Sequence, residues 1–140
     1  MIKRFFLSVN KGTSTSNLTA LVLRLGFGIL MIPKHGYAKL VGFNELKGQF
    51  VDFMGLGSTL SLGLAVFAEF FCSILLVLGL FTRFAALSLL ITSLVILSVH
   101  DWQIFGKYEL GTAFFIGYLA ILIQGPGKYS LDYLIFKKGR

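Results

Sequence analysis

The sequence has little of the charge that water-soluble domains carry on their surfaces. Charged residues make up 14% of the 140-residue chain, whereas a typical soluble domain has about 25%. Hydrophobic residues make up 56%, and the mean hydropathy is +0.82. A soluble domain of this length cannot bury so many apolar side chains. The composition excludes a disordered chain and indicates a single membrane domain over residues 1–140.

Cysteine and histidine are also scarce. Cys72 is the only cysteine, which excludes a disulfide framework, and in apolar surroundings it is expected to be a small core residue. The only histidines are His35 and His100, so a metal site of the Cys/His type is not expected. A haem held by both histidines remains a less favoured alternative, because the two lie in different links between apolar stretches.

Acidic residues are outnumbered by basic ones, six against 13, which gives a net charge of +7. The basic residues lie mainly at the two ends of the chain, beside apolar runs. This pattern indicates contact with anionic lipid head groups. It does not favour nucleic-acid binding, which usually shows a basic face on a soluble fold.

Four apolar stretches predict four membrane spans, at about residues 18–40, 59–81, 84–102 and 108–124. Each is close to the ~20 residues that a helix needs to cross a bilayer. The short second and third links force neighbouring spans to run antiparallel. We therefore expect an all-α, antiparallel four-helix bundle. A cleaved signal peptide is a less favoured reading of the first stretch, because Arg24 interrupts its apolar run.

The distribution of lysine and arginine predicts the orientation of the spans. Eight of these residues lie in the N-terminal segment, the second link and the tail, and four lie in the first and third links. Because cytoplasmic segments carry the excess of positive charge, both termini are expected to face the cytoplasm.

The first link carries apolar residues at helical spacing: Phe43, Leu46, Phe50 and Phe53. They predict a short amphipathic helix at the membrane surface between spans one and two, with a plain loop as the alternative. Before this link, Pro33 is expected to bend the first span, or to end its regular part, near Ile32.

Two polar segments are expected to begin helices. The serine and threonine residues of segment 13–16 are expected to cap the first span. Segment 125–130 contains glycine, proline and lysine, but it follows a transmembrane helix and lacks the context of a nucleotide-binding loop. It is interpreted as a helix stop and turn, with Ser130 capping a short C-terminal helix.

Two ionisable residues fall inside the predicted spans. Arg24 lies about two turns into the first span, and Glu69 lies near the middle of the second. A charge at such depth costs a few kcal/mol, so both side chains should face the bundle interior. We expect Arg24 and Glu69 to form a buried polar centre, with His35 and Lys39 near its outer mouth. The centre either binds a ligand or is an ion pair that fixes the register of the bundle.

Five motifs follow one another along the chain: Leu23-Arg24-Leu25, His35-Gly36 followed by Lys39, Ala68-Glu69, the segment LGLFTR at 78–83 and the segment GPGKYSLD at 125–132. Their order and spacing resemble the DoxX family of small bacterial membrane proteins, over about residues 18–133. The resemblance implies a four-helix integral membrane fold in the bacterial cytoplasmic membrane. Members of this family are linked to quinone-dependent sulfur oxidation, to oxidative-stress complexes and to the maturation of other redox proteins.

The family positions also include Arg83 and Asp132, which lie on the same predicted side of the membrane. We expect them to pair and to lock the tail onto the turn between spans two and three. A pair of this kind, exposed to the head groups, contributes roughly 0 to 1 kcal/mol by itself.

Three functional hypotheses follow. The first is a redox-associated subunit that binds a quinone or a similar amphipathic molecule in the bundle. It is at most one subunit of a quinone-linked oxidoreductase, because the chain has neither a catalytic constellation nor a cofactor motif. The second is a non-enzymatic assembly factor or scaffold for another membrane protein. The third is a small-molecule or proton transporter, which would need to form a homo-oligomer. The expected partners are the lipid bilayer and a membrane or redox protein.

Overall fold

The computed structural model describes residues 12–136, and every regular element in that part of the chain is helical. The orientation prediction depends mainly on basic residues at both ends of the chain. Those at positions 3, 4, 11, 137, 138 and 140 lie outside the described residues.

The first span is a continuous rod with a change of pitch in the middle. Helix α2 (Ser14–Met31) begins after Thr13, whose Oγ1 accepts a hydrogen bond from the backbone N–H of Ser16 at 3.3 Å, which confirms the expected cap. A π-helix, η1 (Ile32–Tyr37), follows and carries Pro33 in its first turn. Proline has no N–H and cannot continue α-helical hydrogen bonding, so the regular helix ends where the sequence predicts. Helix α3 (Ala38–Val41) completes the rod.

The expected amphipathic helix in the first link is mostly absent. Only α4 (Phe43–Leu46) is helical, and residues 47–57 form turns, bends and irregular backbone. Gly48 disfavours a helix by about 1 kcal/mol, and the Asp52 carboxylate accepts a hydrogen bond from the backbone N–H of Gly57 at 2.8 Å, which stabilises a turn instead. The link then folds back onto the second span, where the backbone N–H of Phe53 donates to Ser61 Oγ at 2.9 Å.

The second span again combines α- and π-helical turns. It consists of α5 (Ser58–Val66), η2 (Phe67–Cys72) and α6 (Ser73–Leu78). Gly79 ends it in a left-handed conformation, with φ +70°, three residues before the predicted end. Glycine adopts this conformation without steric cost.

The remaining elements match the predicted stretches closely. Helix α7 (Thr82–Val99) is the third rod, α8 (Glu109–Gln124) is the fourth, and α9 (Leu131–Phe136) is a short C-terminal helix. Ser130 Oγ accepts a hydrogen bond from the backbone N–H of Tyr133 at 3.2 Å. The expected cap of the C-terminal helix is therefore confirmed.

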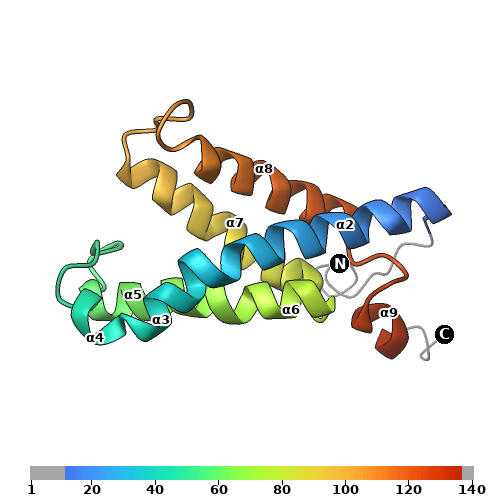
Figure 1. The fold of residues 1–140 in the computed structure, drawn as a ribbon, viewed down its shortest axis with the longest axis horizontal. Coiled ribbons are helices and arrows are strands. Elements are labelled where there is room, and N and C mark those ends of the chain that lie inside the picture. Colours follow the sequence, from blue (N-terminus) through green and yellow to red (C-terminus); the bar gives the residue numbers. More distant parts are fainter. Residues whose placement is uncertain (1–11, 137–140) are drawn as a thin grey trace.

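Successive rods run in opposite directions, and they do not lie parallel over their whole length (Figure 1). Helix α2 packs on α6, and α7 packs on η2 and α6. The α7–α8 hairpin meets the first two rods beside α6 and diverges from them toward α5 (Figure 1). The core lies where the rods converge and contains Met31, Cys72, Leu76, Ala85, Ala86, Leu89, Phe114, Tyr118 and Ile121. Cys72 is fully buried there, as predicted.

The surface of the rods is apolar. In the described part of the chain, three continuous helical stretches are long and apolar enough to cross a membrane, at Ser14–Val41, Ser58–Leu78 and Thr82–Val99, and Glu109–Gln124 is a shorter apolar helix. Large apolar side chains such as Leu30 and Ile123 are more than 60% exposed. These helices satisfy their backbone hydrogen bonds internally, as lipid requires. The chain is therefore an integral membrane protein.

Candidate functional site

The two π-helical segments pack directly against each other. Their closest approach is at Gly36 of η1, where a Cβ atom would lie 2.5 Å from the backbone oxygen of Glu69 in η2. Backbone therefore touches backbone, which only glycine permits. Single π-helical turns within α-helices often mark functional sites. Here, two such turns form the centre of the site.

Glu69 is paired within this contact. Its carboxylate Oε2 forms a salt bridge with the ammonium of Lys39. The side chain of Glu69 is 1% exposed, whereas that of Lys39 is 21% exposed. A buried carboxylate in a membrane span needs such a partner, and the partner reaches it from the far end of the first span.

His35 lies beside this pair, on the same rod as Lys39. The negative charge of Glu69 and the positive charge of Lys39 both interact electrostatically with the imidazole. On another side, the imidazole meets the Phe114 ring edge-to-face, with 5.7 Å between the ring centroids. Helix α8 therefore supplies an apolar ring to a polar group that the first two rods position.

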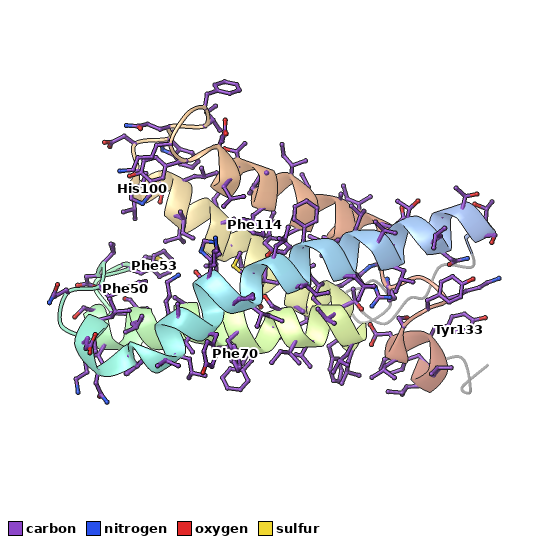
Figure 2. The ribbon with its side chains drawn as sticks, in the orientation of Figure 1. Phe50, Phe53, Phe70, His100, Phe114 and Tyr133 are labelled. Carbon is purple, nitrogen blue, oxygen red and sulfur yellow. The ribbon has the colours of Figure 1, made fainter. Side chains whose placement is uncertain are left out.

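A cavity of about 630 Å³ lies between the diverging rods. Small-molecule sites typically measure about 300–1,000 Å³ and combine apolar walls with a few polar groups. The inner end of this cavity carries Glu69, Lys39 and His35, and most of its wall is apolar. Its lining also includes Phe50 and Phe53 of the first link, which extend toward the space between the rods (Figure 2).

The outer end of the cavity carries a second group of polar side chains. His100, Lys107 and Tyr108 line it from the link between α7 and α8. The rings of His100 and Tyr108 are stacked, with centroids 3.9 Å apart and an interplanar angle of 12°. Tyr108 precedes Phe114 by six residues, so the two ends lie roughly 9 Å apart along α8. Both histidines therefore line one cavity, at opposite ends.

Arg24 is not part of this cavity, although it is fully buried as predicted. Its Nη1 donates to the backbone carbonyls of Leu76 at 3.3 Å and Val77 at 3.2 Å, and its Nη2 donates to the carbonyl of Tyr129. A cation at the end of a helix satisfies carbonyls that lack an intrahelical partner. The expected single polar centre is therefore divided, because Arg24 binds the end of α6 and Glu69 binds Lys39.

Asp132 completes the group around Arg24. Its carboxylate accepts hydrogen bonds from the backbone N–H groups of Phe81 at 2.7 Å and Thr82 at 2.9 Å. Its own N–H donates to the carbonyl of Gly79 at 2.8 Å. Phe81 has no capping side chain of its own, so the tail supplies the cap that α7 lacks. We call Arg24, Asp132 and the turn at 79–81 the tail latch.

Arg83 is also buried next to the tail. A Cβ atom on Gly125 would lie 3.0 Å from Arg83 Nη2. The hydrogen bonds of the Asp132 carboxylate described above go to the turn that precedes Arg83, so the tail is held onto that turn through its backbone. The side-chain pair of Arg83 and Asp132 stays a prediction.

Sequence reasoning named both residues of the Lys39–Glu69 pair without pairing them, and it did not associate Lys107 and Tyr108 with a site. The four-residue spacing of His35 and Lys39 places them on one face of a helix. This spacing is the feature of the sequence that indicates that both side chains contribute to the inner end of the cavity. The outer end depends on the path of the link between α7 and α8, for which the sequence contains no comparable signal.

Among residues 12–136, no group of three or more His, Cys, Asp or Glu side chains is arranged to hold a metal ion. A family model described as DoxX matches residues 19–102, which is more than half of the chain. Comparisons with curated proteins and with solved structures give no significant match.

Proposed function

Because this chain belongs to the DoxX family, we propose that it binds a quinone or a similar amphipathic molecule in its cavity, as the membrane subunit of a redox system. The observation that supports this proposal is the form of the cavity, with apolar walls and three polar side chains at its inner end. This is the form of a site that positions one polar group of an otherwise apolar ligand.

The residues at the inner end fit the chemistry of a quinone ring. The ring is flat and apolar, and its carbonyl oxygens accept hydrogen bonds. The Lys39 ammonium has three N–H groups and uses one on Glu69, so it retains donors for a carbonyl. His35 offers a second donor, and Phe114 offers an aromatic surface. A bound quinone would supply two-electron redox chemistry, and the protein would bind and orient it.

We also propose that α8 is the fourth span of an antiparallel four-helix bundle in the bacterial cytoplasmic membrane, with both termini cytoplasmic. The outer end of the cavity would then lie on the extracytoplasmic side. A reporter that is active only in the cytoplasm should be active when fused to either terminus. It should be inactive when it is inserted after Phe105 in the third link. Activity in the link, or inactivity at one terminus, would contradict this topology.

Replacing Glu69 by glutamine should lower the amount of quinone that is bound by at least about tenfold. The change removes the charge that positions Lys39, and hydrogen bonds to charged groups are worth about 1.5–3 kcal/mol. The measurement is the quinone extracted per mole of full-length protein, purified in mild detergent from membranes. Glu109→Gln is the matched control, because Glu109 is exposed and does not line the cavity.

A double variant keeps this test decisive if the single variant does not fold. Lys39→Met combined with Glu69→Gln removes both charges together, so no unpaired charge remains in the span. It should fold and bind no quinone. Quinone retained by this folded double variant would refute the proposal. Wild-type protein that lacks quinone but copurifies with a stoichiometric protein partner would favour the assembly-factor hypothesis instead.

A further inference from the structure

The charges that line the cavity do not balance. The lining contains two lysines, Lys39 and Lys107, and one carboxylate, that of Glu69. The lysine and glutamate side chains of the lining therefore carry one excess positive charge. A cavity with apolar walls concentrates the field of such a charge. It therefore favours a guest that carries a negative charge.

The excess charge is located at the outer end. The Lys39 ammonium is already neutralised by Glu69. Within residues 12–136, no carboxylate lies at ion-pair distance from Lys107 Nζ, which lies 5.7 Å from the centroid of the Tyr108 ring. An anionic group would therefore be attracted to Lys107 more strongly than to the inner pair.

The neighbours of Lys107 add hydrogen-bond donors. The stacked rings of His100 and Tyr108 are held at 3.9 Å, which fixes an imidazole and a phenol hydroxyl beside the same part of the cavity. Both groups can donate to an oxyanion. Three groups that can donate to an anionic oxygen, all from one link, thus line the outer end of the cavity.

The wall next to these donors is apolar. Helix α7 contributes Val95, Ile96 and Val99 to it, and α5 contributes Leu64. A hydrated free anion gains nothing from such a wall, whereas an acyl chain attached to the anion removes apolar surface from water. The whole cavity, including its inner end, measures about 630 Å³, so its outer part can hold one acyl chain and not a whole diacyl lipid.

We propose that the outer end of the cavity binds the phosphate head group of an anionic membrane lipid, with one acyl chain along the apolar wall. Lys107 supplies the charge, and His100 and Tyr108 supply further donors. The polar groups of this site are distinct from those at the inner end, and lipid binding here does not depend on quinone binding at the inner end. The chemistry it recognises is a phosphate carried by an acyl chain.

The test is lipid retention by the full-length protein in detergent, measured by native mass spectrometry. Phosphatidylglycerol is the anionic probe, and phosphatidylcholine is the probe with no net charge. Wild-type protein should retain phosphatidylglycerol in preference to phosphatidylcholine. Lys107→Gln should weaken the retention of phosphatidylglycerol about tenfold, as expected for a lost charge-assisted hydrogen bond.

Lys47→Gln is the matched control, because Lys47 is exposed in the first link and does not line the cavity. It should retain phosphatidylglycerol like the wild type. His100→Phe keeps an aromatic ring for the stack and should weaken retention, so it provides a second variant if Lys107→Gln does not fold. The double variant Lys39→Met with Glu69→Gln removes both charges of the inner pair and should leave retention unchanged, which separates this site from quinone binding.

Several outcomes would overturn the inference. Equal retention by Lys107→Gln and by the wild type would show that this ammonium does not hold the lipid. Equal retention of phosphatidylglycerol and phosphatidylcholine would show that the site does not select its lipid by charge. Inorganic phosphate alone, if it raised the melting temperature as much as phosphatidylglycerol, would identify a site for a free anion. Loss of phosphatidylglycerol in the Lys39→Met and Glu69→Gln double variant would place the lipid at the inner end.

Discussion

Replacing Gly36 by alanine should lower the free energy of unfolding by about 3 kcal/mol, the upper part of the range for inserting atoms into a well-packed core. The added Cβ would lie 2.5 Å from the backbone oxygen of Glu69 and 2.7 Å from Cα of Phe70. Both are backbone atoms and cannot turn aside, so the two π-helical segments must separate. The measurements are the melting temperature in detergent and the yield of monodisperse protein.

The same separation should damage the site. Lys39 and Glu69 lie on the two rods that would move apart, so their ion pair would lengthen. We therefore expect Gly36→Ala to lose bound quinone even in the fraction that remains folded. Stability and ligand content would fall together.

Gly26 provides the matched control in the same span. A Cβ atom at Gly26 would meet no atom within 4 Å. Because alanine is favoured over glycine in a helix by about 1 kcal/mol, Gly26→Ala should leave the melting temperature unchanged or raise it. If the two alanine variants melted alike, the close contact between η1 and η2 would be refuted.

Much of the helical organisation follows from local patterns in the sequence. The apolar stretches predict the rods, and hydroxyl side chains predict the caps at Thr13 and Ser130. The cost of a charge in lipid predicts that Arg24 and Glu69 face inward. Each of these inferences needs only neighbours along the chain, and each is confirmed by the burial and hydrogen bonds described above.

The pairing of the charges could not be predicted in the same way. Arg24 meets the carbonyls of Leu76 and Val77, seven and eight residues beyond Glu69, or roughly 10 Å along the rod at 1.5 Å per residue. The reason is that the start of α2 extends well past the end of α6 (Figure 1). Aligning the ends of the two rods, at Ser14 and Leu78, would place Arg24 and Glu69 at similar depths, and this alignment misses the offset.

The tail accounts for the offset. The Asn17 amide accepts a hydrogen bond from the backbone N–H of Lys128 at 3.0 Å, and the Gln124 side chain donates to the carbonyl of Ser16 at 3.0 Å. The segment after α8 therefore covers the extended start of α2. The sequence shows a turn at 125–130, but it does not show which rod this turn covers.

The tail latch leads to the second large prediction. Replacing Asp132 by asparagine should lower the free energy of unfolding by about 3 kcal/mol. The side chain is 4% exposed, and asparagine would present an NH₂ donor to one of the N–H groups of Phe81 and Thr82. Hydrogen bonds to a charged acceptor are worth about 1.5–3 kcal/mol. The variant also loses the negative charge, which in the wild type stabilises the start of α7 and attracts the Arg24 guanidinium.

Thermal unfolding in detergent measures this effect, and Asp101→Asn is its control. Asp101 is exposed in the third link at φ +53°, a conformation that asparagine tolerates. The melting temperature of the Asp101→Asn variant should therefore stay close to that of the wild type.

Charge reversal separates the capping of α7 by Asp132 from a side-chain pair between Asp132 and Arg83. Asp132→Arg should not be rescued by Arg83→Asp, because a guanidinium cannot accept the N–H groups at the start of α7. Full rescue would mean that a side-chain pair, and not the cap, holds the tail.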